Sequence, residues 1–292
     1  MAKAAFIGLG VMGFPMAGHL AKAGLDVCVY NRNGAKADAW LEAYRGNKAM
    51  TPREAAEGAN FIFTCVGNDH DLRAVVLGET GALAGMEPGA ILIDNTTTSA
   101  EVARELAAAC ERQGCAMLDA PVSGGEAGAI NGALTVMVGG DEAAYEKAEA
   151  VMAHFARATK LMGPSGAGQL TKMVNQICIG GLVQALSEAL LFAEKAGLDG
   201  RAVVETISKG AAQSWQMENR YETMIDNQFD FGFAVDWMLK DLSIVLDEAE
   251  RNGAPLPITE LVKSYYEDVK NGGGGRWDTS SLIARLRGFR IT

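Results

Sequence analysis

A lysine and two amide side chains share one face of an apolar stretch near the middle of the chain. Asn175 and Gln176 follow Lys172 at three and four residues, and these spacings place side chains on the same face of a helix. Burying such polar groups among apolar neighbours is costly, which indicates that they have a function in a site. A partly desolvated lysine exchanges protons closer to neutral pH, so the pattern indicates general acid–base chemistry by Lys172.

A second group of candidate residues forms a glycine-rich turn. Ser123, Gly124 and Gly125 follow a short apolar segment that ends in Asp119-Ala120-Pro121. Exposed backbone amides in such a turn can bind a carboxylate. Taken alone, the turn is equally well explained as a connection without a ligand.

A third group lies at the start of the chain, where Gly8, Gly10 and Gly13 form the pattern G-x-G-x-x-G. An expected strand over residues 4–9 precedes it, and an expected helix starts near Phe14. In this context the first glycine permits a tight turn, the second lets the backbone approach a pyrophosphate, and the third lets helix and strand pack closely. An ordinary glycine-rich turn is the weaker interpretation. The pattern predicts a dinucleotide site formed by Gly8, Leu9, Gly10, Val11, Met12 and Gly13.

The end of the next expected strand, over residues 26–30, indicates which dinucleotide binds. NAD-specific sites usually place a carboxylate there, on the ribose 2′-hydroxyl, whereas this chain has Asn31 and Arg32. Arg32 can pair with a 2′-phosphate, and Lys36 adds a second positive charge nearby. The alternative is that both cations are solvated surface charges. Because no carboxylate competes for the site, we expect NADP as the preferred cofactor, with NAD possible.

Two further strand ends are expected to border the cofactor, because ligands of open parallel sheets bind outside the carboxyl ends of the strands. Val66 and Gly67 end one of these strands, and Thr97 follows the other. Thr98 and Glu101 fit a capping box. We therefore assign Thr97 to the cofactor and Thr98 to the start of a helix.

The elements that position these residues differ between the two halves of the chain. In the first half, nearly continuous apolar runs alternate with stretches of helical length: AAFIGLG, DVCVYN, NFIFTCV, AILIDN, AMLDAP and LTVMVGG. This rhythm is typical of parallel strands that helices bury on both faces. It predicts an α/β fold with an N-terminal, doubly wound Rossmann domain over residues 1–163.

The second half, residues 164–292, is expected to be an all-helical domain. A proline-free apolar stretch from Ala167 to Lys195 predicts one long helix that ends before Gly197. Later segments repeat apolar residues at spacings of three and four and end at glycine. The run Gly272–Gly275 is expected to be a flexible loop.

Composition restricts the partners and the compartment. The 292 residues include 26 basic and 36 acidic side chains, and the net charge of −10 disfavours nucleic acid and anionic membranes. No uninterrupted apolar stretch of about 18 residues and no signal-peptide pattern are present, which predicts no membrane association. Five cysteines without a CxxC pair indicate reduced thiols and a cytoplasmic location. Three widely separated histidines predict no metal site.

Five markers in sequence order give the chain a resemblance to a known family. It resembles the beta-hydroxyacid dehydrogenase family, which includes 3-hydroxyisobutyrate dehydrogenase, tartronate semialdehyde reductase and glyoxylate/succinic semialdehyde reductases. The resemblance extends over nearly the whole chain. Its markers are FIGLGVMGFPMAGHL, LIDNTTT, LDAPVSGGEAGAINGALTVMVGG, GAGQLTKMVNQ and the late pair Lys240-Asp241.

The resemblance implies roles for the polar residues of the second half. Lys172 matches the general acid/base of the family, and Asn175 matches the amide that orients the substrate. Many members have asparagine where this chain has Gln176, which leaves the division of labour between Asn175 and Gln176 open. Lys240 matches a late lysine beside the cofactor.

The resemblance also implies the reaction. The turn Ser123-Gly124-Gly125 matches the one that binds the substrate carboxylate, so we expect hydride transfer between NAD(P)(H) and a small 3-hydroxy carboxylic acid or its semialdehyde. Arg32 and Lys36 resemble the residues at these positions in the glyoxylate/succinic semialdehyde reductases, which use NADPH. Val66-Gly67 stands where many members of the family have leucine-proline. An imine reductase and a non-catalytic dinucleotide-binding module are the alternatives. The family associates through its helical half, which implies a homodimer or homotetramer.

Overall fold

The computed structural model describes residues 2–288 of the chain. The chain divides into two compact units, Met1–Lys172 and Met173–Thr292. The division falls within a long helix, whereas the sequence predicts a boundary at residue 163.

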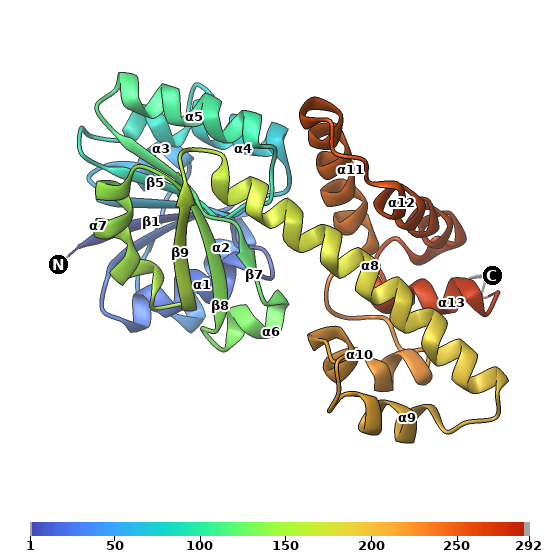
Figure 1. The fold of residues 1–292 in the computed structure, drawn as a ribbon. Coiled ribbons are helices and arrows are strands. Elements are labelled where there is room, and N and C mark those ends of the chain that lie inside the picture. The colour runs from blue at the N-terminus through green and yellow to red at the C-terminus, as the bar shows by residue number, and fades with distance from the viewer. Residues whose placement is uncertain (1, 289–292) are drawn as a thin grey trace. The chain divides into compact units, whose positions relative to one another are not determined.

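The first unit is built on a nine-stranded sheet with strand order β3-β2-β1-β4-β5-β6-β8-β7, in which β9 also pairs with β8. Five of the six predicted apolar runs form strands of its parallel part, whereas β3 matches no predicted run. β1 lies between β2 and β4. Figure 1 shows the sheet, with β1 and β5 labelled. All four residues of β5 are buried, as expected for a strand covered on both faces. The parallel strands are β1 (Lys3–Ile7), β2 (Asp26–Tyr30), β3 (Asn47–Lys48), β4 (Phe61–Thr64), β5 (Ile91–Asp94) and β6 (Ala116–Asp119).

The remaining three strands depart from the predicted parallel sheet. β8 (Leu134–Gly140) runs antiparallel to β6, and β7 (Val122–Ser123) runs antiparallel to β8. β9 (Ala156–Gly163) is parallel to β8 and has no counterpart among the predicted strands. Its sequence, ARATKLMG, is mostly exposed or half-buried and therefore lacks the apolar run that marks a buried strand.

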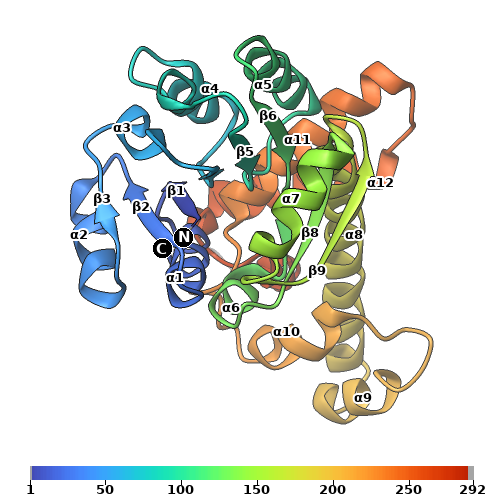
Figure 2. The ribbon, with the colours of Figure 1, turned by 90° about the vertical axis from the view of Figure 1, so that its left-hand side faces the viewer.

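Helices cover both faces of the sheet (Figure 2). One hydrophobic core joins the sheet to α1 (Gly13–Lys22), α2 (Gly34–Ala43) and α7 (Glu142–Met152). A second core joins it to α3 (Pro52–Ala56), α4 (Asp69–Leu77) and α5 (Ala100–Arg112). The short helix α6 (Gly125–Ile130) and a 3-10 turn at Ala82–Gly85 belong to the same unit. The predicted doubly wound Rossmann fold is confirmed.

The second unit is helical, as predicted, and its described residues contain one isolated bridge between Ala234 and Asp278 but no strand. The first helix, α8 (Ala167–Lys195), has the predicted bounds and begins in the first unit. The other helices are α9 (Gly200–Ile207), α10 (Trp215–Ile225), α11 (Val235–Asn252), α12 (Pro257–Val269) and α13 (Leu282–Leu286), with a 3-10 turn at Thr279–Ser281.

The glycine run of the second unit, predicted as a loop, lies in a kinked helical turn. Lys270–Gly274 form a π-helical turn in which Gly273 has a φ of 96°. A Cβ at Gly274 would lie 2.6 Å from the Trp277 ring. Close packing against this ring accounts for Gly274, and the left-handed backbone accounts for Gly273.

α8 bears on the expectation that no segment of the chain is long and apolar enough to span a membrane. Its mean hydropathy of 1.5 over an 18-residue window makes it long and apolar enough to cross a membrane by length and composition. The core helix of a soluble protein passes the same test, and 44% of the window is buried within the structure. Buried polar side chains along the helix, Gln176, Gln184 and Ser187, favour a core helix.

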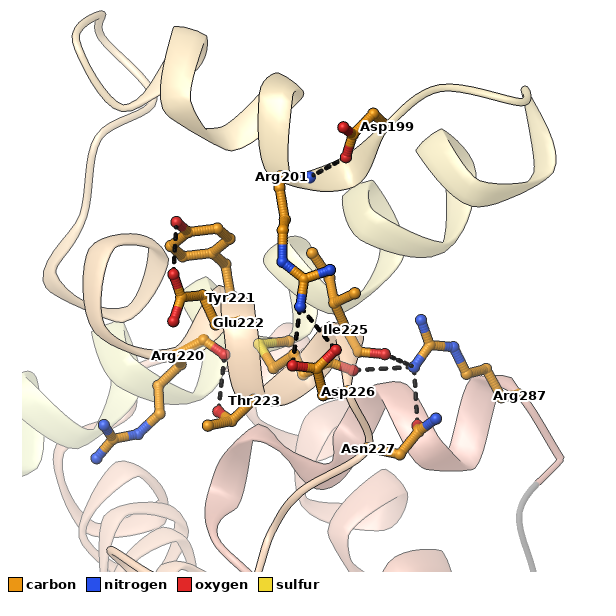
Figure 3. Close-up of polar contacts among 11 residues, drawn as sticks. Asp199, Arg201, Arg220, Tyr221, Glu222, Thr223, Ile225, Asp226, Asn227 and Arg287 are labelled. Carbon is orange, nitrogen blue, oxygen red and sulfur yellow. Dashed lines mark hydrogen bonds and ion pairs between the residues drawn. The ribbon is translucent and has the colours of Figure 1, made fainter.

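Charged contacts near the end of α10 join the helices of the second unit (Figure 3). Arg287, directly after α13, donates to Oδ1 of Asn227 at 2.8 Å. It also pairs with Glu194 of α8 at 2.8 Å. Arg201 of α9 makes two hydrogen bonds to Asp226, at 2.7 and 2.8 Å. Both arginines therefore connect the α10 terminus to elements that are distant in sequence.

Candidate functional site

The glycine turn between β1 and α1 has the backbone that the motif predicts. Gly8 has a φ of 103°, its N–H donates to the Tyr30 carbonyl at 2.8 Å, and a Cβ there would overlap the carbonyl oxygen of Cys65. A Cβ at Gly13 would overlap the carbonyl oxygen of Gly8. Gly10 differs, because a Cβ there meets no atom within 4 Å. The open side of the turn thus lies at the glycine expected to face the pyrophosphate.

The N-terminus of α1 suits an anion. Its N-cap residue Met12 is half-buried and makes no side-chain capping bond, and the first turn carries no acidic residue. Val11 is exposed beside it, while the Leu9 side chain is buried and its N–H donates to Asn31 Oδ1 at 2.9 Å. Uncapped N–H groups at the positive end of the helix dipole fit a dinucleotide pyrophosphate.

The residues after β2 form the expected cationic edge, with one addition. Asn31 bridges the glycine turn to the next loop, since its Nδ2 also donates to the Asn33 carbonyl at 3.0 Å. Arg32 and Lys36 are exposed. The expectation that no carboxylate competes there is wrong, because Asp71 at the start of α4 lies 3.4 Å from the Arg32 guanidinium. The two loops meet because β2 and β4 flank the same strand, β1.

The ends of β4 and β5 lie next to the glycine turn. Val66 approaches Gly8, whose Cβ would lie 3.2 Å from Val66 Cγ1, and the Val66 N–H donates to Thr96 Oγ1 at 3.1 Å. Gly67 and Thr97 are half-buried on the following loops.

The predicted cap of α5 is wrong by one residue. Ser99 is the N-cap and accepts from the Val102 N–H at 3.1 Å. Thr98 is fully buried instead, and its N–H donates to Gln169 of α8 at 3.1 Å. The contact with another helix therefore turns Thr98 inward, away from the capping position.

Asp119, at the end of β6, holds the first turn of α8 and is not among the sequence-predicted site residues. Its Oδ1 accepts from the Gly166 N–H at 2.7 Å, and its Oδ2 accepts from the Gln169 N–H at 2.9 Å. The Gln169 side chain donates to the Thr96 carbonyl at 2.7 Å. Burial raises the pKa of Asp119, while these backbone donors act in the opposite direction. The first turn of α8 is thereby fastened to the ends of β5 and β6.

Asp94, at the end of β5, is a second buried carboxyl group; the sequence places it at a strand end that borders the cofactor but assigns it no role. It pairs in register with Asp119 and accepts hydrogen bonds at Oδ1 from Thr64 Oγ1 at 2.7 Å and from the Thr96 N–H at 3.1 Å. Burial raises the pKa of Asp94 to about 7. An aspartate at the end of each of two adjacent strands is the sequence signal that indicates this pair.

The polar face of α8 continues from Lys172 to Gln176. Lys172 is buried with 7% of its surface exposed, and Gln176 is buried with 2% exposed, while Asn175 is half-buried. Asn175 Nδ2 donates to Gln176 Oε1 at 2.8 Å, and Gln176 Nε2 donates to Asp241 Oδ2 at 2.6 Å. Lys240 pairs with the buried Asp241 at 3.1 Å. Within the second unit, one network therefore brings together Asn175, Gln176 and Lys240, with Asp241 as the link that sequence reasoning left without a role.

The Ser123–Gly125 turn, predicted to bind a carboxylate, is accessible to solvent. Ser123 ends β7, pairs in register with Thr135 and is half-buried. Gly124 and Gly125 are exposed, with φ values of 136° and 63°, and lead into α6 without a side-chain cap. Their N–H groups lie at the start of a helix, where an acceptor is favoured.

Comparisons with known proteins agree along the whole chain. A family model described as the NAD binding domain of 6-phosphogluconate dehydrogenase matches residues 3–163, and one described as NAD-binding of NADP-dependent 3-hydroxyisobutyrate dehydrogenase matches residues 166–286. An uncharacterized oxidoreductase of Shewanella frigidimarina (strain NCIMB 400) is 65% identical over 290 residues, which are 99% of this chain and 100% of that protein. The 2-hydroxy-3-oxopropionate reductase of Escherichia coli (strain K12) is 36% identical over 284 residues, 97% of each chain.

A solved structure gives the same result. The 3-hydroxyisobutyrate dehydrogenase of Mycobacterium tuberculosis, with L-serine, has a TM-score of 0.89 and 31% identity over 98% of this chain and 99% of that one. The fold, the dinucleotide turn and these relatives define an NAD(P)-dependent dehydrogenase. The chain belongs to the beta-hydroxyacid dehydrogenase family, and the resemblance found in the sequence is confirmed.

Proposed function

We propose that this enzyme interconverts a small 3-hydroxy carboxylic acid and its semialdehyde, with Lys172 as the general acid/base. The observation that carries the proposal is the burial of Lys172 on α8, next to a first turn fastened by Asp119 and Gln169. When bound, the dinucleotide accepts or supplies the hydride. Lys172 accepts the hydroxyl proton during oxidation and returns it to the carbonyl oxygen during reduction. The Ser123–Gly125 turn binds the carboxylate, and Asn175 orients the substrate, supported by Gln176.

The test of this role is Lys172→Ala, with Lys195→Ala at the exposed end of the same helix as the control. General acid–base assistance contributes roughly 10²- to 10⁴-fold, so kcat should fall by that factor in Lys172→Ala. The Kd of NADPH, measured by fluorescence titration, should stay within about twofold, since the dinucleotide turn is intact. Turnover at the wild-type rate in Lys172→Ala would refute the proposed mechanism.

The cofactor of the proposed reaction is NADP(H). Arg32 is an exposed cation at the end of β2, and Lys36 is one in the first turn of α2, which contains no acidic residue. Asp71 pairs with Arg32 through an exposed contact of the kind that contributes little, and a 2′-phosphate would compete for the same guanidinium. The name of the family model that matches residues 166–286, an NADP-dependent enzyme, agrees with this choice.

Cofactor choice is tested by comparing kcat/KM for NADPH and NADH in wild type and Arg32→Ala. The wild type should prefer NADPH, and Arg32→Ala should lose about tenfold with NADPH and little with NADH, because one charged contact is removed. Arg45→Ala, which removes an exposed arginine beyond the other end of α2, is the control. A wild-type preference for NADH would overturn the assignment.

The proposed substrates are small carboxylic acids, because the Ser123–Gly125 turn is proposed to bind one carboxylate group. Relatives are described as a 2-hydroxy-3-oxopropionate reductase and a 2-(hydroxymethyl)glutarate dehydrogenase, both acting on hydroxy or oxo acids. 3-Hydroxyisobutyrate, 3-hydroxypropionate, tartronate semialdehyde, glyoxylate and succinic semialdehyde form the screen, followed by absorbance of the reduced nicotinamide. Turnover of none of these carboxylates would favour a dinucleotide-binding module without catalysis.

The proposed enzyme is a homo-oligomer that uses α8. Exposed apolar side chains lie along one stripe of this helix, with Val174 at 61%, Leu182 at 44% and Phe192 at 73% exposure. Ala185 and Ala189 are exposed on the same stripe. A continuous apolar stripe on a helix is stabilised by burial against another surface, and a second copy of the chain supplies a self-complementary one.

A further inference from the structure

His19 of α1 contacts the end of α6, a helix more than a hundred residues away in the sequence. Its Nε2 lies 3.0 Å from the carbonyl oxygen of Ala129 and 3.1 Å from that of Ile130. Because both neighbours are acceptors, Nε2 carries the hydrogen and donates it. The last carbonyl groups of a helix have no donor within the helix, and His19 supplies one to α6.

The turn that follows α6 packs against His19. Gly132 has a φ of 63°, and the Ala133 N–H donates to the Gly128 carbonyl at 2.8 Å, as in a helix that ends with a left-handed glycine. A Cβ at Gly132 would lie 3.2 Å from Cε1 of His19. The imidazole is therefore held closely against the turn that ends α6.

The contact at the C-terminus of α6 also restrains the position of its N-terminus. The helix has six residues and begins at Gly125, directly after Ser123 and Gly124. At 1.5 Å per residue it is about 9 Å long, so a contact at its C-terminus also restrains its N-terminus. Ala129 is fully buried in the same hydrophobic core as residues of α1. The carboxylate turn and α1 are thus parts of one packed assembly.

α1 itself starts at Gly13, at the end of the dinucleotide turn. We infer that His19 is a positioning residue that fixes the Ser123–Gly125 turn relative to the bound dinucleotide, through α6. The inference rests on the proposed function, since it needs a carboxylate on that turn. His19 contacts neither ligand in this role, and its effect is the fixed geometry that hydride transfer requires.

Three variants test the inference. His19→Phe removes the donor and keeps a ring, whereas His19→Gln keeps an N–H donor near the position of Nε2. His70→Phe changes an exposed histidine of α4 and is the matched control. His19→Phe should raise KM for the carboxylate substrate about five- to tenfold, with the Kd of NADPH within about twofold, and His19→Gln should restore most of the loss. An unchanged KM, or an equal rise in the Kd of NADPH, would overturn the inference.

Hydrogen exchange of the NADPH-bound protein separates this inference from the proposed function. Amides of residues 123–133 should exchange faster in His19→Phe than in wild type, His19→Gln and His70→Phe, whether or not a substrate is turned over. If wild type turns over no carboxylate but exchange rises, the proposed function fails and the α1–α6 link stands. If exchange in this segment is unchanged, the inference fails even in an active enzyme.

Discussion

At the scale of single residues, two glycines of the dinucleotide turn serve different ends. A Cβ at Gly13 would overlap the Gly8 carbonyl, whereas a Cβ at Gly10 meets no protein atom within 4 Å. The fold therefore requires Gly13, whereas we expect the approach of the pyrophosphate to require Gly10. The two glycines of one sequence motif are thus distinguished by what surrounds them in the fold.

This difference predicts opposite results for two matched variants. Gly10→Ala should leave the Tm of the ligand-free protein unchanged and weaken NADPH binding about tenfold, because the methyl group occupies the space of the pyrophosphate. Gly13→Ala should destabilise the fold by about 1–3 kcal/mol, the usual cost of overpacking. Thermal unfolding and fluorescence titration measure both. Wild-type affinity in Gly10→Ala would contradict the placement of the pyrophosphate.

Asp94 predicts a dependence of stability on pH. Burial raises its pKa from 3.8 to about 7, so between these values the folded chain binds more protons than the unfolded chain. Stability from protonated Asp94 is present below its ordinary pKa and is lost as the pH rises through about 7, at up to about 1.4 kcal/mol per pH unit. In Asp94→Asn, the free energy of unfolding in urea should therefore fall less between about pH 5 and pH 8. If the free energy of unfolding changed with pH equally in wild type and Asp94→Asn, Asp94 would be excluded as the source of the pH dependence.

At the scale of elements, α8 begins on a cap supplied by a strand. Asp119 of β6 accepts the N–H groups of Gly166 and Gln169, which an ordinary helix would direct to a residue just before it. α5 is capped locally, by Ser99. The two helices therefore depend on partners at very different sequence separations.

Asp119→Ala should lower the free energy of unfolding by about 2–4 kcal/mol, since it removes two bonds to a carboxylate and leaves buried N–H groups without acceptors. Ser99→Ala, which removes a local cap and a hydroxyl contact with Asp69, should cost less, about 1 kcal/mol. Urea denaturation of both variants gives the comparison. A loss in Asp119→Ala no larger than in Ser99→Ala would show that water replaces the carboxylate.

At the scale of the whole molecule, the apolar stripe of α8 predicts assembly. Leu182→Glu and Phe192→Glu place charges on the stripe and should shift the mass measured by light scattering toward a monomer at micromolar concentration, because a charge is costly in an apolar interface. Leu77→Glu, at an exposed apolar position on α4, is the control and should leave the mass unchanged. A monomeric wild type would refute the proposed oligomer.

Local pattern by itself determined a large part of this protein. The apolar runs predicted six of the strands, the proline-free stretch predicted α8 with its bounds, and the glycine spacing predicted the turn that Gly8 and Gly13 form. These features depend on residues that are close in the sequence, where side-chain periodicity and backbone sterics act directly.

Tertiary structure decided what depends on residues far apart in the chain. The antiparallel direction of β8, the approach of Asp71 to Arg32 and the buried pair Asp94 and Asp119 follow from which strands are neighbours. Gln176 likewise finds its carboxylate partner on α11, 65 residues away. No local pattern encodes these meetings, because the desolvation and hydrogen bonding that define a buried polar group depend on the neighbours that folding brings to it.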